Sequence, residues 1–309
     1  MKLSIVSTLF RSAVHLDEFH RRSTASARAV AGDDYEIVLV NDGSPDDSLE
    51  RAVRLSSTDP HLIVVDLSRN FGHHKAMMTG LSHSAGELVF LIDSDLEEEP
   101  EWLVDFSDIM ARERCDVVYG VQERRKGNVF ERWTGQWFYW IFNALTRLSL
   151  PENSVTARLM SRRYVNALLG HDEREVFIAG LWHITGFSQH GRLVTKHATS
   201  ESSYTLRHKL SLLVNAVTSF SNAPLIAIFY TGIAISLLAA ASIAYLFANW
   251  FFMSRPMSGW TSVMASIWLI GGLVISFIGV VGIYLSKIFV ETKRRPYTIV
   301  RSVFRGGKE

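Results

Sequence analysis

Cysteine and net charge are both scarce in this chain of 309 residues. Cys115 is the only cysteine, so an internal disulfide is excluded, which suits a domain in a reducing compartment. The 32 basic and 31 acidic side chains leave a formal net charge of +1, and this balance excludes a typical nucleic-acid binder. The N-terminus, MKLSIVSTLF, has one lysine and a short apolar run, so we interpret it as a first strand and not as a signal peptide.

Charged side chains are also missing from two long segments near the C-terminus. Residues 210–254 contain no Asp, Glu, Lys or Arg, and after Arg255 the segment 256–286 is again uncharged. A helix needs roughly 20 apolar residues to cross a bilayer core. We therefore predict two membrane-spanning helices, at about 224–252 and 260–288, and consider a pair of buried core helices the weaker alternative.

The charges that flank these segments predict their orientation. Basic side chains precede the first span and follow the second, whereas the connecting loop holds only Arg255. By the positive-inside rule both chain ends face the cytoplasm and the spans form a hairpin. The expected organisation is a cytoplasmic domain over 1–205, a juxtamembrane helix over 206–222, the hairpin over 223–290 and a cytoplasmic tail over 291–309.

Short β-branched runs alternate with helical patterns in the first part of the chain. The predicted strands are 2–10, 35–42, 61–68, 87–95 and 116–121, and the predicted helices are 13–30, 46–57, 72–84 and 100–113. This alternation, with almost wholly apolar strands, indicates an α/β fold with a mostly parallel sheet covered on both faces. Ligands of such sheets bind at the carboxyl ends of the strands.

The segment 128–148, NVFERWTGQWFYWIFNALTRL, has apolar residues at helical spacing. It carries Trp133, Trp137 and Trp140, and tryptophan is favoured at the membrane–water boundary. We predict a membrane-surface helix at about 129–148. Packing of this helix on the sheet as ordinary core is the alternative.

Carboxylates cluster after the fourth predicted strand, in VFLIDSDLEEEPEWL (89–103). Asp93 and Asp95 alternate there and can turn toward one point, and Glu97 is a further candidate. Mg²⁺ is usually held by one or two carboxylates together with substrate phosphates, so we predict a metal carrying a diphosphate at these residues. We interpret Glu98, Glu99 and Glu101 as solvated carboxylates at a helix start.

A second group of candidates follows the second and third predicted strands. Asp42 can accept a hydrogen bond from a nucleobase and Gly43 allows close approach, although a simple turn also explains both. The segment LSRNFGHHKAMMTGL (67–81) brings Arg69 and Lys75 to the same edge. His73 and His74 are adjacent on a predicted helix and point in different directions, so we interpret this pair as surface residues and not as a metal site.

Several motifs occur in an order that resembles family 2 glycosyltransferases of the polyprenyl-phosphate type. They are VNDGSPDD, DLSRNFGHHKAMMTGL, IDSDLEEEPEWL, DVVYGVQERRKG, RLMSRRYVNALL, TSFSNAPL and VETKRRPYTIVR. That family includes dolichyl-phosphate mannose synthase and bacterial undecaprenyl-phosphate glucosyltransferases, and the resemblance covers nearly the whole chain. It implies a GT-A (Rossmann-like) catalytic domain at the cytoplasmic face of the bacterial inner membrane. It also implies metal-dependent transfer of one sugar from a nucleotide sugar to a polyprenyl phosphate, with inversion.

The resemblance also implies roles for individual residues. Asp42 would contact the base, with Gly43, Arg69 and Lys75 also at the nucleotide sugar. Asp93, Asp95 and Glu97 would hold Mg²⁺ or Mn²⁺. Arg158 of the RLM motif would lie at the acceptor phosphate, with Arg207 and Lys209 as further candidates. The implied partners are a nucleotide sugar (we favour a UDP-sugar), undecaprenyl phosphate, the bilayer and further copies of the chain, such as a tetramer.

Four departures from the family pattern favour a divergent subgroup. Thr8-Leu9-Phe10-Arg11-Ser12 replaces a Pro-x-Tyr-Asn-Glu-like element, and Glu97 stands where Gln is usual. Thr156 stands where some relatives carry a carboxylate base, and Ser202-Ser203-Tyr204 lacks the lysine of a Ser/Thr-Lys-Tyr element. Two other functions stay open. A processive polysaccharide synthase would need Gln-x-x-Arg-Trp, where VFERW has Val129 in place of the Gln, and the intact Asp93 and Asp95 argue against an inactive membrane adaptor.

Overall fold

The structure, a computed structural model, describes residues 1–122, 145, 153–196, 214, 217–253 and 259–306. The predicted membrane-surface helix over 129–148 lies outside these residues except for Leu145. Most of the predicted juxtamembrane helix, including the candidates Arg207 and Lys209, also lies outside them.

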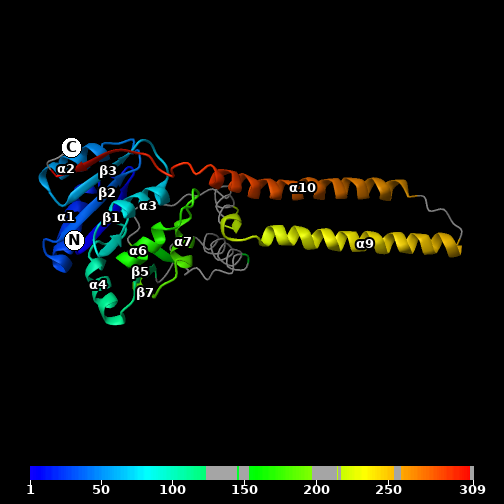
Figure 1. Ribbon diagram of the computed structural model, residues 1–309, viewed down its shortest axis with the longest axis horizontal. Coiled ribbons are helices and arrows are strands. Elements are labelled where there is room, and N and C mark those ends of the chain that lie inside the picture. The colour runs from blue at the N-terminus through cyan, green and yellow to red at the C-terminus, as the bar shows by residue number, and fades with distance from the viewer. Residues whose placement is uncertain (123–144, 146–152, 197–213, 215–216, 254–258, 307–309) are drawn as a thin grey trace.

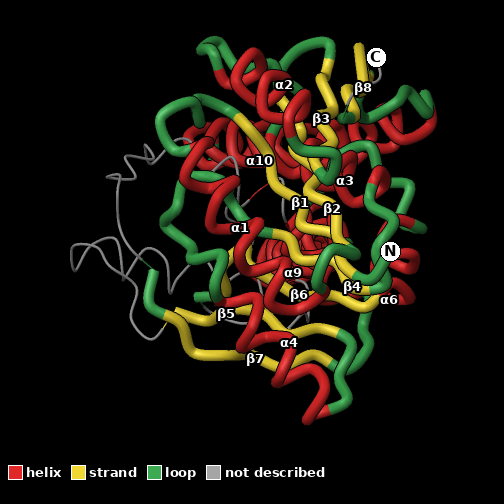
Figure 2. Tube along the Cα trace, turned by 90° about the vertical axis from the view of Figure 1, so that its left-hand side faces the viewer, coloured by secondary structure: helices red, strands yellow, loops and turns green. Residues whose placement is uncertain are grey.

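An eight-stranded mixed sheet forms the centre of the domain, in the order β7-β5-β6-β4-β1-β2-β3-β8 (Figure 2). The strands are β1 Leu3–Leu9, β2 Tyr35–Asn41, β3 Leu62–Leu67, β4 Leu88–Leu91, β5 Val117–Gln122, β6 Ser154–Ser161, β7 Gln189–Val194 and β8 Val300–Arg305. Strands β1 to β4 are mutually parallel, whereas β6 runs antiparallel to β4 and β5, and β8 runs antiparallel to β3. The predicted α/β class is confirmed, and the antiparallel strands β6 and β8 make the sheet mixed.

Helices cover both faces of this sheet. They are α1 Leu16–Ala31, α2 Ser48–Thr58, α3 His73–His83, α4 Trp102–Glu113, α6 Arg162–Leu169 and α7 Ile178–Ile184. Along β1, Ile5 enters the core beneath α1 and α4, and the next residue, Val6, enters the core beneath α3. Cover on both faces leaves every residue of β1, β2 and β3 buried, which explains why most of their side chains are apolar.

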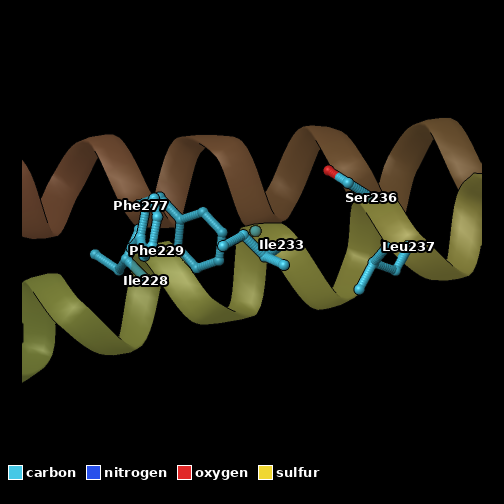
Figure 3. Close-up of a pocket in the computed structure, with 7 residues that line it drawn as sticks. Ile228, Phe229, Ile233, Ser236, Leu237 and Phe277 are labelled. Atoms are coloured by element: carbon cyan, nitrogen blue, oxygen red, sulfur yellow. The ribbon is translucent and has the colours of Figure 1, made fainter.

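Two long apolar helices, α9 Ala223–Met253 and α10 Trp260–Thr292, extend side by side away from the domain (Figure 1). The segments Ala223–Ser242 and Ser266–Thr292 are long and apolar enough to cross a membrane, and none of their residues is buried in the protein. A groove of about 460 Å³ lies between the helices, lined by apolar side chains such as Phe229 and Phe277 (Figure 3). The predicted hairpin is thus present as two helices whose apolar surfaces fit a bilayer.

Polar contacts join the domain-side end of α10 to the loop that precedes α7. The carboxylate of Glu291 accepts the backbone N–H of Arg174 at 2.9 Å and that of Glu175 at 3.3 Å. Lys287 Nζ lies 3.1 Å from Glu175 Oε2. The chain then returns to the sheet as β8, a strand that was not predicted within the tail over 291–309.

Candidate active site

The carboxyl ends of β1, β2 and β4 meet at one edge of the sheet, where the N-terminal end of the antiparallel β6 joins them. The hydroxyl of Ser94, just after β4, donates to the carbonyl of Thr8 at 2.8 Å and so ties the two strand ends together. The predicted candidates Asp42 and Asp93 both lie at this edge, as parallel strands require.

Asp93 is held by α3 as well as by the sheet. His73, the first residue of α3, has its Nε2 3.2 Å from Asp93 Oδ1 and its Nδ1 3.0 Å from Thr8 Oγ1. Burial alone would raise the pKa of Asp93, but the contact with His73 and the charge of Lys196 hold that pKa below its usual range. Asp93 is therefore an anion at neutral pH.

Asp95 and Glu97 belong to the same loop. Asp95 Oδ1 accepts the backbone N–H of Glu97 at 3.0 Å, and burial, with the charge of Asp93, raises the pKa of Asp95. Glu97 Oε2 lies 3.1 Å from the ammonium of Lys196, which follows β7. Glu97 thus has Lys196 as a cationic partner in this structure. Its role as a metal ligand stays a prediction.

The interpretation of Glu98 as a solvated carboxylate is wrong, because its side chain is fully buried. Its Oε1 accepts the backbone N–H of Thr156 at 3.0 Å, at the start of β6, and its Oε2 has no hydrogen-bond partner among the described residues. Burial, together with the charge of Asp93, raises the pKa of Glu98 to about 7. Glu101, by contrast, is half-exposed and pairs with Arg22 at 2.6 Å.

The chemistry of this loop fits a divalent cation. Four carboxylates, from Asp93, Asp95, Glu97 and Glu98, face Lys196 and His73, and their mutual repulsion contributes to the raised pKa values of Asp95 and Glu98. Hard oxygen donors suit Mg²⁺ or Mn²⁺. Within the described residues no group of three or more His, Cys, Asp or Glu side chains is arranged to hold a metal ion. Mg²⁺ is usually held by one or two carboxylates together with substrate phosphates, so a group of three protein ligands is not required.

Asp42, which is predicted to lie at the nucleotide sugar, is buried and fixes a neighbouring loop. Its carboxylate accepts the backbone N–H groups of Phe71 at 2.7 Å and Gly72 at 3.0 Å. Gly43 has φ +60°, and a Cβ at this position would lie 2.5 Å from the backbone nitrogen of Asn70. Only glycine fits where these two loops cross, so the close approach predicted for Gly43 is to protein backbone.

Arg69 and Lys75, which are also predicted to lie at the nucleotide sugar, lie on or next to the loop that Asp42 holds. The Arg69 side chain is exposed, and its guanidinium carbon lies 4.1 Å from the ring centroid of Phe71. Lys75 is partly buried in the first turn of α3. The structure thus brings Asp42, Gly43 and Arg69 together, and Lys75 follows in the first turn of α3.

Arg158 lies on β6, two residues from Thr156 and on the same face of the sheet. It is 2% exposed, donates to the carbonyls of Thr156 and Val155 at 3.2 Å each, and lies against the ring of Trp182. Burial lowers the pKa of Arg158 to about 9, and the charge of Glu98 opposes this shift. The side chain is therefore a buried cation at neutral pH, which the sequence did not indicate.

His73, Glu98 and Lys196 are the site residues that the sequence did not identify. The position of His73 offered a signal, because it begins a helix at the carboxyl edge of the sheet. Lys196 offered none, since it follows a strand far along the chain and meets Glu97 only through the order of strands in the sheet.

Comparisons with known proteins bear on the whole chain. The family model described as "Glycosyl transferase family 2" matches residues 16–169. A protein of Mycobacterium tuberculosis (strain CDC 1551 / Oshkosh) named "Putative glycosyltransferases" is 48% identical over 98% of this chain and 89% of its own length. The "SfII prophage-derived bactoprenol glucosyl transferase" of Shigella flexneri is 30% identical over 99% of both chains. Among solved structures, S. aureus TarS 1–349 in complex with UDP-GlcNAc is 17% identical, with a TM-score of 0.49 over 71% of this chain and 66% of the other.

Proposed function

Because this chain belongs to glycosyl transferase family 2, we propose that it transfers one sugar from a nucleotide sugar to a polyprenyl phosphate at the cytoplasmic face of the membrane. The chain is a glycosyltransferase with a GT-A-like α/β domain and two apolar helices. The choice of acceptor is supported by the presence, in one chain, of an acidic site at the sheet edge and of helices long enough to cross a bilayer. A relative that is 30% identical over 99% of both chains is named a bactoprenol glucosyl transferase.

The donor would lie along the carboxyl edge, with its nucleotide beside Asp42, Gly43, Arg69 and Lys75. A UDP-sugar is the donor we favour. Asp93 and Asp95 would hold Mg²⁺ or Mn²⁺, which supplies charge neutralisation for the departing diphosphate. Glu97 is a further candidate ligand, for which it would have to leave Lys196.

The acceptor needs positioning more than it needs a base. A phosphate monoester has a second pKa of about 6, so near pH 7 it is already largely a dianion. Thr156 therefore suffices where a hydroxyl acceptor would require a carboxylate. Attack on the anomeric carbon from the side opposite the leaving group inverts its configuration.

We assign the acceptor phosphate to Arg158, with Arg207 and Lys209 as further candidates. Charge-assisted hydrogen bonds from a guanidinium suit a phosphate, and the buried charge of Arg158 would be compensated by that anion. Because Arg158 is 2% exposed, contact with a phosphate requires the indole of Trp182 to move aside.

The bacterial cytoplasmic membrane, with both chain ends inside, is the location that follows from the flanking charges. A homo-oligomer, such as a tetramer, also remains part of the proposal.

Incubation of membranes that contain the protein with radiolabelled UDP-, GDP- and dTDP-sugars and undecaprenyl phosphate tests this function. We expect label in the organic phase with one donor, dependent on the added acceptor and absent for Asp93→Asn. Label in a polymer would identify a processive synthase, and label released only as free sugar would identify a hydrolase. Absence of any product from every donor would contradict the proposal.

A further inference from the structure

The segment that follows α10 returns to the part of the site where we propose that the nucleotide sugar binds. After α10 ends at Thr292, residues 300–305 form β8 and pair antiparallel with β3 (Figure 1). The end of β3 leads directly into the loop of Arg69 to Gly72, which Asp42 holds by two hydrogen bonds. The last strand of the protein is therefore in contact with the base of a loop proposed to bind nucleotide.

A β-bulge sets the direction of one side chain in β8. Asp66 pairs with Ser302, but the next residue of β3, Leu67, pairs with Val300. Arg301 is thus the extra residue of the bulge. Bulges locally twist a strand and redirect a side chain, and here the side chain of Arg301 turns toward the end of β3.

Arg301 contacts the residues on both sides of Leu67, the last residue of β3. Its Nη2 donates to the carbonyl of Ser68 at 2.6 Å, and its Nη1 lies 3.4 Å from Asp66 Oδ2. Ser68 immediately precedes Arg69. One guanidinium therefore contacts both Asp66, near the end of β3, and Ser68, which precedes the loop. A planar fork of donors allows this geometry.

The contact continues from Asp66 into the other donor-side loop. Asn41, the last residue of β2, donates from Nδ2 to Asp66 Oδ1 at 2.8 Å. Asn41 Oδ1 in turn accepts the backbone N–H of Ser44 at 3.3 Å. Asp66 is buried, with a side chain only 3% exposed, and its carboxylate oxygens contact Asn41 and Arg301.

We propose that Arg301 is a positioning residue for the nucleotide sugar, acting through Asp66 and Ser68. It holds the ends of β2 and β3 so that the loops 42–44 and 68–72 are formed before the nucleotide binds. Preformed loops bind more tightly because less ordering accompanies binding. This inference rests on the proposed function, and it adds that the segment beyond the second span completes the donor site.

The variants Arg301→Gln and Arg301→Lys test it, with Arg305→Gln as the matched control. Arg305 is an exposed arginine of the same strand, opposite Ile63. The full chain in detergent is titrated calorimetrically with UDP and with GDP, each with Mg²⁺, and donor KM and kcat are measured for transfer. We expect Arg301→Gln to weaken nucleotide binding about tenfold, or 1.4 kcal/mol. Donor KM should rise in parallel while kcat stays within about twofold.

The pattern among variants separates positioning from general loss of stability. Arg301→Lys keeps the charge but not the fork, so its affinity should lie between that of the wild type and Arg301→Gln. Asp66→Asn should weaken binding similarly, and the double variant should be no weaker than the worse single one. Arg305→Gln should bind like the wild type.

Equal affinities of Arg301→Gln and Arg305→Gln would overturn the inference while leaving the proposed function intact. If Arg301→Gln does not fold, Arg301→Lys decides, and wild-type affinity in that variant overturns the inference. A wild-type chain that binds neither nucleotide and transfers no sugar overturns the proposed function, and this inference with it.

Discussion

His73 Nε2 lies 3.2 Å from Asp93 Oδ1, so the first residue of α3 contacts the carboxylate that follows β4. The other ring nitrogen of His73 lies 3.0 Å from the hydroxyl of Thr8 at the end of β1. The imidazole therefore fixes the orientation of Asp93 relative to two strands and a helix. Such a neighbour typically orients a metal ligand without touching the metal.

Replacement of Asp93 or Asp95 by asparagine should abolish transfer while the fold is kept. Each change removes a charged oxygen ligand and leaves the side-chain volume almost unchanged. We expect the initial rate of lipid labelling to fall on the order of a hundredfold or more. Asp105→Asn on the exposed face of α4 is the control and should keep full activity. Activity that survives in either variant, or in excess EDTA, would contradict the metal assignment.

His73→Gln should weaken metal binding without removing a ligand. Loss of a neighbour that orients a ligand reduces metal affinity about 10–100-fold. Titration of the apo protein with Mn²⁺, followed by the paramagnetic resonance of the free ion, measures that affinity directly. His74→Gln is the control, because His74 Nδ1 contacts the carbonyl of Val176, whereas the contact with the Asp93 carboxylate comes from His73. Equal Mn²⁺ affinities in the two variants would show that His73 does not support the site.

Thr156 and Arg158 should respond differently to truncation. A phosphate acceptor needs a fixed cation and no base, so Thr156→Ala should slow transfer by about tenfold or less, equivalent to 1.4 kcal/mol. Arg158→Ala should slow it far more, because the acceptor phosphate loses its guanidinium. Rates at saturating undecaprenyl phosphate compare the two, and circular dichroism checks that the buried site still folds. An inactive Thr156→Ala beside a nearly normal Arg158→Ala would indicate an acceptor that must lose a proton.

The sequence predicted the parallel half of the sheet well because those strands are buried on both faces. Strand β2 runs Tyr35–Asn41 without one exposed residue, and such a run has few alternatives. The hairpin was predicted for a similar reason, since uncharged segments of this length fit only a bilayer or a large core. Strands β7 and β8 carry exposed charged residues at the two edges of the sheet, so their composition does not distinguish them from loops.

Of the site residues, the sequence predicted mainly those that directly follow a buried strand. Asp93 and Asp95 were found because they follow a buried strand, and Asp42 for the same reason. The burial of Glu98 and its contact with Thr156 depend on β6 lying beside β4, a pairing that no local pattern shows. The edge contact of Arg301 with Ser68 is similarly non-local. Truncation before the hairpin would therefore remove β8 along with the two apolar helices.

Asp46→Asn should lower stability in a way that depends on pH. Partial burial alone would raise the pKa of Asp46, but hydrogen bonds from the hydroxyls of Ser44 and Ser48 and from the backbone N–H of Ala13 lower that pKa to about 2. The unfolded value is about 3.9, so the ionised carboxylate stabilises the fold above that pH, and this contribution is lost as the pH falls toward 2. We expect a loss of about 1–2 kcal/mol at pH 7, or roughly 2–6 °C in Tm.

Thermal unfolding of the detergent-solubilised chain at pH 7, 5, 3.5 and 2.5 measures this effect. The difference in Tm between the wild type and Asp46→Asn should be constant from pH 7 to pH 5 and should shrink at the two lower values. Asp47→Asn is the control, because Asp47 is exposed and its ion pair with Arg51 lies at the surface, where such pairs contribute little to stability. A difference that grows as the pH falls would mean that Asp46 is not held as a carboxylate, since only an acid of lowered pKa gives up its stabilisation on protonation.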